Sequence, residues 1–166
     1  MILPYPLEND AETGLYSFTT DKNVRYICRF RDVTSRLSPL LGIYDLEIFD
    51  FDFYPENEPQ DKVKFDAAIC MTICDLFTRF FTSDLRVLVY ICDSSDERHQ
   101  YRDHLFNLWH SRHVAHLLTR IAIEISIGDE PTYGCALVTH QFPHMDVLQS
   151  ELIDKIDEFM IDKYGL

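Results

Sequence analysis

The sequence predicts an α+β domain in which helices cover a mixed, mostly antiparallel sheet. Short segments of alternating or continuous apolar residues are typical of strands, and longer segments with apolar residues at helical spacing are typical of helices. The chain has 166 residues, of which 46% are hydrophobic, and this apolar content is far above that of a disordered chain. A chain of this length normally folds around a single core. We therefore expect one domain that spans residues 1–166.

The first part of the chain contains three predicted strands. Leu15–Thr19 and Val24–Arg31 are rich in β-forming residues and are separated by a short polar turn. In the second segment, apolar residues alternate with arginine, which predicts one buried face and one solvated face. Asp32–Gly42 contains serine, proline and glycine and is predicted to be a loop. Tyr44–Tyr54 then forms the third strand.

Phenylalanine and aspartate alternate along the third strand, from Phe49 to Phe53. Asp50 and Asp52 therefore share a face that could gather a cation, but a solvated strand face explains them without a ligand, and we expect the solvated face. Ile48 precedes Phe49 and breaks the alternation. This break indicates either a bulge or a change in which face is covered.

The segment Asp61–Phe81 carries the strongest helical pattern in the chain. Ile69, Ile73 and Phe77 recur at helical spacing, and we expect them in the core. Arg86–Cys92 follows as a nearly continuous apolar run, which is typical of a strand whose two faces are both covered by helices.

A second helix is predicted after this strand. Ser94 and Glu97 fit the reciprocal capping box that opens a helix. The helix runs through Trp109 and extends at most to Leu118.

The chain closes with a hairpin and a third helix. Arg120–Ile127 and Thr132–Gln141 are predicted strands joined by a turn-forming group. Val147–Tyr164 has apolar residues at a spacing of four, which predicts an amphipathic helix with an acidic outer face.

The five cysteines lie inside apolar stretches rather than at the spacing of a disulfide framework. We expect them to be reduced core residues. Cys70 and Cys74 lie four residues apart on a predicted helix and could supply half of a metal site, but no second pair with ligand spacing exists. The sequence therefore predicts no metal site.

The formal net charge of −13 argues against two classes of partner. Binding to nucleic acid depends on lysine and arginine that displace counterions from phosphates, and anionic membranes attract the same basic residues. We expect neither partner. A basic protein or a small amine stays open as a partner, as does a role in solubility alone.

The chain also lacks the sequence features of an exported or anchored protein. No apolar run approaches the roughly twenty residues that cross a bilayer. The first residues do not form a charged and then apolar leader. We therefore expect a cytoplasmic protein.

The predicted order is strand, strand, strand, helix, strand, helix, strand, strand, helix. Over residues 15–141 this order resembles the core of GNAT-type N-acetyltransferases. In that family, backbone amides at the start of the central helix hold the pyrophosphate of coenzyme A. The resemblance implies acetyl-CoA as the cofactor and the loop Asn57–Phe65 as its site. The loop departs from the family's pattern, because it contains no glycine and has Val63 and Phe65 where small residues are expected.

The resemblance also implies particular site residues. Gln60 stands where the family's leading glutamine or arginine falls, and Lys62 and Lys64 lie beside it. Ser94 stands where the family carries asparagine, and we count it with these three as cofactor-binding. Tyr101 follows at the family's spacing of seven, where a tyrosine protonates the departing thiolate, so Tyr101 is the catalytic candidate. A partly buried helix tyrosine is the alternative.

A second resemblance covers the segment Tyr90–Trp109. It is similar to the characteristic stretch of a small bacterial family known only as a domain of unknown function. This resemblance implies a bacterial origin and a common fold, and it transfers no chemistry.

Two classes of function stay open. The first is a GNAT-like domain, either an acyl-CoA-dependent acyltransferase for a basic amine or a relative that has lost catalysis. The second is a non-enzymatic module whose acidic surface binds a basic protein, in the manner of an inhibitor or antitoxin. The absent glycines favour the second class, whereas Tyr101 and the order of elements favour the first.

Overall fold

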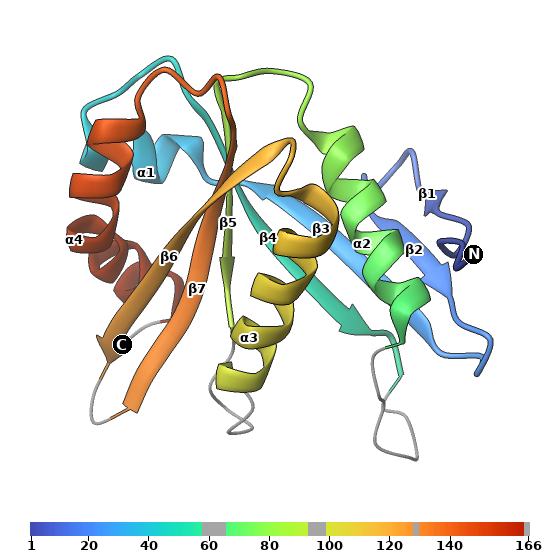
Figure 1. Cartoon of the computed structure of the whole chain (residues 1–166). Coiled ribbons are helices and arrows are strands. Elements are labelled where there is room, and N and C mark those ends of the chain that lie inside the picture. Colours follow the sequence, from blue (N-terminus) through green and yellow to red (C-terminus); the bar gives the residue numbers. More distant parts are fainter. Residues whose placement is uncertain (58–65, 93–98, 128–129, 165–166) are drawn as a thin grey trace.

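The computed structural model describes residues 1–57, 66–92, 99–127 and 130–164. It has a seven-stranded mixed sheet, mostly antiparallel, with helices on both faces (Figure 1). The predicted α+β class and its mixed sheet are confirmed.

The strands are β1 (Glu8–Asn9), β2 (Tyr16–Thr19), β3 (Arg25–Asp32), β4 (Glu47–Pro55), β5 (Arg86–Ile91), β6 (Leu118–Ile127) and β7 (Glu130–Thr139). The helices are α1 (Thr34–Leu41), α2 (Ala67–Phe80), α3 (His99–Trp109) and α4 (Met145–Tyr164), and a π-turn, η1 (His110–Val114), follows α3. The predicted strands and helices are found with end residues shifted by a few positions. The predicted helix residues 61–65 and the capping box at Ser94 and Glu97 lie outside the described residues.

The sheet order is β1-β2-β3-β4-β5-β7-β6. β4 and β5 pair in parallel, and the other neighbouring strands pair antiparallel. The crossover from β4 to β5 passes through α2, as a parallel connection requires. The short strand β1 at one edge is an addition to the predicted order.

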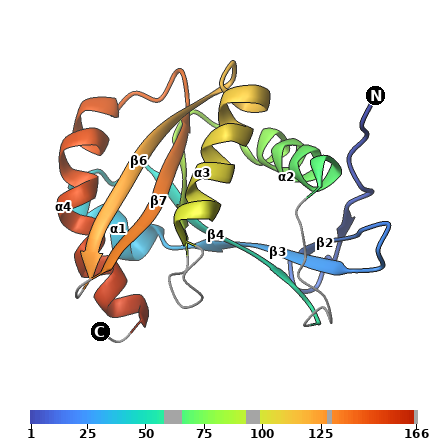
Figure 2. The same ribbon diagram turned by 60° about the horizontal axis from the view of Figure 1, so that its bottom comes forward.

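The sheet separates two hydrophobic cores. α2 and α3 pack on one face, and α1 and α4 pack on the other (Figures 1 and 2). The predicted core residues of α2, Ile69, Ile73 and Phe77, are confirmed in the first core with at most 3% of their surface exposed. On the second face α4 packs over β6, and α1 packs against α4 and β4. No helix of the described residues covers the far ends of β2, β3 and β4 on that face (Figure 2).

The prediction of a loop at Asp32–Gly42 is wrong, because the helix α1 occupies most of this segment. Leu37 and Leu41 are buried against the second core, and Gly42 ends the helix with φ at 69°, a conformation that glycine adopts without steric cost. Pro39 lies within the helix, where it removes one backbone hydrogen bond. Packing against α4 stabilises a helix that its local sequence disfavours.

The alternation along β4 is confirmed, but the solvated face predicted for Asp50 is wrong. The pairing of β4 with β3 runs without a bulge from Phe49 to Pro55. The break in the apolar alternation at Ile48 therefore reflects a change in which face of the strand is covered. Ile48 and Asp50 are each 1% exposed, because α1 packs against this part of β4. Asp52 lies further along the strand and accepts hydrogen bonds from two arginines of β3.

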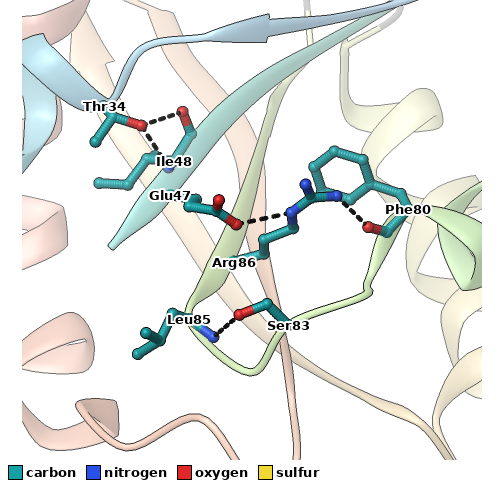
Figure 3. Close-up of polar contacts among 7 residues, drawn as sticks. All are labelled: Thr34, Glu47, Ile48, Phe80, Ser83, Leu85 and Arg86. Atoms are coloured by element: carbon teal, nitrogen blue, oxygen red, sulfur yellow. Dashed lines mark hydrogen bonds and ion pairs between the residues drawn. The ribbon is translucent and has the colours of Figure 1, made fainter. Parts of the chain in front are cut away.

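Polar contacts near the starts of β4 and β5 join four elements (Figure 3). Arg86 donates from Nε to Glu47 of β4 at 2.9 Å and from Nη1 to the carbonyl of Phe80 at the end of α2 at 2.6 Å. Its guanidinium also lies over the Phe80 ring, 4.9 Å from the centroid, a cation–π contact. On the other side of β4, the Thr34 hydroxyl of α1 exchanges hydrogen bonds with the backbone of Ile48.

Gly134 allows β7 to pack closely against β5. A Cβ atom at this position would lie 2.4 Å from the Tyr90 carbonyl oxygen and 2.7 Å from Cδ1 of Ile91. Because a backbone oxygen cannot move aside without breaking the ladder, only glycine fits here.

Replacing Gly134 with alanine should therefore destabilise the domain. Overpacking of this kind typically costs about 1–3 kcal/mol, measurable by chemical denaturation. Glu124→Ala, at an exposed position on the neighbouring β6, is the matched control and should change stability by less than about 0.5 kcal/mol. Equal stability of Gly134→Ala and wild type would contradict the close approach.

Ile73→Ala should also be strongly destabilising, because Ile73 is fully buried in the middle of α2. Large-to-small substitutions in a core cost about 2–5 kcal/mol. Arg79→Ala on the exposed face of the same helix removes only a surface ion pair with Asp75 and should cost a few tenths of a kcal/mol. A loss below about 0.5 kcal/mol for Ile73→Ala would contradict the orientation of α2.

Candidate functional site

The carboxyl ends of β4 and β5 separate, and this separation defines the candidate site. The parallel pairing begins at Glu47 with Arg86 and ends at Asp50 with Val89. Beyond that point β4 continues to Pro55 beside β3, and β5 continues beside β7. The two strand ends point apart in Figure 1, and the first turns of α2 and α3 lie at the same end of the sheet.

Aromatic rings fill the space beside these strands on the face that α2 and α3 cover. Phe51 of β4 lies 6.1 Å from Tyr90 of β5, measured between ring centroids. Tyr90 stacks on Phe106 of α3 at 4.1 Å, and Phe77 of α2 packs edge-on against Phe51. Phe51, Tyr90 and Phe106 are all less than 9% exposed. On this face the diverging strands therefore enclose packed side chains.

Asp66 caps the start of α2. Its Oδ1 accepts a hydrogen bond from the Ile69 amide at 2.7 Å, and its backbone is extended, as expected of an N-cap residue. The carboxylate also lies at the positive end of the helix dipole, where a negative charge is stabilised. An anion supplied by the chain itself therefore occupies the start of this helix.

Tyr5 holds the same carboxylate from the other side. Its hydroxyl donates to Oδ2 of Asp66 at 2.8 Å, and its backbone amide donates to the Thr72 hydroxyl of α2. The ring of Tyr5 stacks on Phe18, which in turn stacks on Tyr26. Burial, with a contribution from the charge of Asp66, raises the pKa of Tyr26 to about 12. The N-terminal segment thus lies against α2 and fixes the cap.

An ion pair connects α3 to the far strand of the sheet. Arg120 of β6 donates from Nη2 to Oδ1 of Asp103 at 2.7 Å, and the two side chains are 11% and 27% exposed. Burial raises the pKa of Asp103, although the charge of Arg120 opposes this shift. Nε of Arg120 is buried and has no hydrogen-bond partner among the described residues. The pair holds α3 against β6, and neither group is free to bind a substrate ion.

Two thiols lie near this ion pair. Burial raises the pKa of Cys92 to about 12 and that of Cys135 to about 11. The charge of Asp103 contributes to both shifts, whereas Arg120 opposes the shift of Cys135. Both thiols therefore stay protonated at neutral pH and are poor nucleophiles. All five cysteines are free and buried, which confirms the predicted reduced core.

The structure places one of the predicted site residues. Tyr101 lies in the first turns of α3 with 59% of its surface exposed, so it is a surface tyrosine rather than a partly buried one. Phe106, further along the same helix, is buried. The predicted cofactor-binding residues lie outside the described residues: Gln60, Lys62, Lys64 and Ser94.

Sequence reasoning missed the residues that the structure brings together here. Asp66 stands three residues before Ile69, the spacing of an N-cap and the amide it caps, but the helical pattern of 61–81 hid this signal. Tyr5 comes from a segment with no regular pattern. Asp103 and Arg120 are 17 residues apart and are joined only by the packing of α3 on the sheet.

The sequence pattern of a family of unknown function, DUF6169, matches residues 61–154. The chain belongs to this family. The part that matches DUF6169 includes Asp66, the Asp103–Arg120 pair and Gly134. No curated protein and no solved structure shows significant similarity to the chain. Among the helices of the described residues, none has both the length and the apolar character that a membrane span requires.

The raised pKa of Asp103 has a testable sign. The folded state holds this proton at pH values where the unfolded chain, with an aspartate pKa of about 3.9, has lost it. The group therefore favours the folded state at low pH, and this benefit is lost as pH rises through the folded pKa. In an NMR titration Asp103 should titrate above the ordinary value, and Arg120→Gln should raise its pKa further.

Asp10 is the internal control for this titration. Its carboxylate accepts hydrogen bonds from the amides of Glu12 and Thr13, which lower its pKa. Asp10 should therefore titrate below the ordinary value in the same experiment. An Asp103 pKa as low as that of Asp10 would show that the ion pair outweighs the burial.

Proposed function

We propose that this domain is a GNAT-like scaffold that has lost coenzyme A and serves as a non-enzymatic module that binds a basic protein. The order of the sheet supports the scaffold. Antiparallel strands lead through α2 to one parallel strand, β5, and then through α3 to a final hairpin. The separation of β4 from β5 after Asp50 and Val89 lies where a GNAT-type enzyme admits its cofactor.

The position of the Asp66 carboxylate is the main support for the proposed loss of coenzyme A binding. A pyrophosphate would need the free amides and the positive potential at the start of α2. Asp66 already bonds the Ile69 amide there, and the Tyr5 hydroxyl holds it in place. A second anion at this position would meet like charge, which disfavours binding. The filled aromatic layer between β4 and β5 adds a steric obstacle to an acyl chain.

Surface charge supports the partner class. The net charge is −13, and α4 alone presents the exposed acids Asp146, Glu151, Asp154 and Glu158. Complementary charge speeds the encounter with a basic protein and disfavours acidic partners. In this proposal Tyr101 is an exposed aromatic residue available for contact with a partner, a residue type enriched at interfaces.

The same proposal includes a compartment. Five free thiols favour a reducing environment, and the resemblance of Tyr90–Trp109 to a bacterial family favours a bacterial cytoplasm.

Calorimetry with acetyl-CoA tests the loss of the cofactor. The wild-type domain should give neither binding heat nor a shift in melting temperature at millimolar acetyl-CoA, since a ligand that binds the folded state must stabilise it. Asp66→Asn is the matched variant, because asparagine caps a helix about as well as aspartate but carries no charge. This variant should bind acetyl-CoA more tightly than wild type if the carboxylate excludes the pyrophosphate.

Two results would redirect the proposal. Micromolar binding of acetyl-CoA by the wild-type domain, with turnover lowered by Tyr101→Phe, would support the acyltransferase hypothesis instead.

A purified basic partner should form a complex of fixed stoichiometry that weakens as salt is raised. A complex insensitive to salt would contradict the electrostatic part of the proposal.

A further inference from the structure

The second face of the sheet is covered by helices over only part of its width. α4 packs over β6, and α1 packs against α4 and β4. No helix of the described residues lies over the far ends of β2, β3 and β4 on this face (Figure 2). The face therefore has a raised half, made of helices, and a bare half, made of strands.

The bare half carries a row of arginines from β3. Arg25, Arg29 and Arg31 point to this face, because the residues that alternate with them point into the first core, and their side chains are 43%, 40% and 39% exposed. Arg25 bonds Glu56, whereas Arg29 and Arg31 both bond the single carboxylate of Asp52. Two guanidinium groups share one carboxylate, so most of their N–H donors make no bond among the described residues.

The raised half carries the opposite charge. Leu148, Leu152 and Ile156 of α4 are buried in the second core, so the rest of the helix surface faces away from its own sheet. Glu151 and Asp154 are exposed there, and neither has an ion-pair or hydrogen-bond partner among the described residues. α4 thus presents acids that lack a partner, a short distance from arginines that have spare donors.

Each half also exposes one large apolar side chain. Tyr54 of β4, on the bare half, is 42% exposed, and Ile153 of α4, on the raised half, is 43% exposed. Protein interfaces typically combine aromatic or apolar residues and arginine at their centre with a polar rim. Both halves therefore have the composition of a contact surface.

The two halves fit one another between two copies of the chain. A two-fold axis that runs parallel to the strands, beyond this face, turns the raised half of one copy over the bare half of the other. Each copy then supplies one α4 and receives one, as a self-complementary dimer requires. The lengths also match, because the 20 residues of α4 extend about 30 Å and the 8 residues of β3 extend about 27 Å.

The area of such a contact is sufficient for a specific dimer. A helix about 30 Å long and about 10 Å wide covers roughly 300 Å². Each copy contributes two surfaces of this size, its own α4 and its own bare half, which gives roughly 600 Å² per copy. A typical specific interface buries about 800 Å² per partner, and weaker ones bury less.

We propose that a second copy of this chain covers the bare half, in a symmetric dimer in which the acids of each α4 meet the arginines of the other copy's β3. The net charge of −13 per chain opposes association, but exposed charges more than about 8 Å apart are largely screened at physiological salt. The opposite charges at the interface lie in contact and are screened less. The dimer does not rest on the proposed function, and a basic partner that binds α4 would compete with it.

Sedimentation of the full chain over a range of concentrations, with no other protein present, tests the dimer. Wild type should dimerise at micromolar concentration. The charge reversals Arg29→Glu/Arg31→Glu and Glu151→Lys/Asp154→Lys should each raise the Kd at least a hundredfold, because like charges then meet. An equimolar mixture of the two reversed chains should dimerise again, since opposite charges meet at both contacts.

Arg79→Glu is the matched control for these reversals. Arg79 lies on α2, on the other face of the sheet, with 66% of its side chain exposed, so this variant should dimerise as wild type does. Thermal unfolding of each variant shows that it is folded. A wild type that stays monomeric at about a hundred micromolar, a dimer that neither reversal weakens, or a mixture of reversed chains that stays monomeric would overturn the proposal.

Cross-linking provides a measurement that does not depend on charge reversal. Tyr54→Cys and Ile153→Cys introduce thiols at exposed positions, whereas the native cysteines are buried and react slowly. A mixture of the two variants, treated with a short bis-maleimide, should give a covalent dimer. Tyr101→Cys, exposed on the other face, should give none when mixed with Ile153→Cys. Equal cross-linking in both mixtures, or none in either, would contradict the proposed contact.

Discussion

The parallel pairing of β4 with β5 is the contact on which the rest of the structure depends. It spans only Glu47–Asp50 and Arg86–Val89, yet it joins the antiparallel strands β1–β4 to the β5–β7–β6 unit. Val87, Leu88 and Val89 are completely buried, because the helices of both faces meet over this strand. Arg86 secures the junction by bonding both β4 and the end of α2. A strand covered on both faces cannot shift its register without exposing apolar side chains.

The shortness of this pairing determines the shape of the candidate site. Past Val89, β5 follows β7, and the close approach at Gly134 holds the two strands together. β4 instead follows β3. The two strands therefore separate, each following the neighbour on its other side. The helices that follow them, α2 and α3, begin at the same end, so their first turns border the opening of the sheet (Figure 1).

The chemistry at this end is dominated by groups that the chain pairs internally. Asp66 bonds the first turn of α2 and the Tyr5 hydroxyl, and Asp103 bonds Arg120 across the edge of the first core. The Asp103–Arg120 pair is mostly buried, so removing either partner would leave the other charge unpaired at a high cost. These internal pairs leave little positive electrostatic potential to attract an incoming anion. They support the proposal that the domain does not bind coenzyme A.

The sequence by itself determined the alternation of strands and helices, the two faces of β3 and the buried side of α2. These features depend on local periodicity. An apolar residue on the inner face of its element, such as Ile73 of α2 or Cys28 of β3, is buried whichever neighbour that element packs against. Tertiary structure decided the features that local periodicity does not encode. α1 forms across Pro39 because Leu37 and Leu41 are buried in the second core, beside α4, and Asp50 is buried because that helix then covers β4. The partners of Asp66 and Asp103 come from Tyr5 and Arg120, far along the chain. Only folding brings such residues together, since the energy of a polar contact depends on distance in space rather than on separation in sequence.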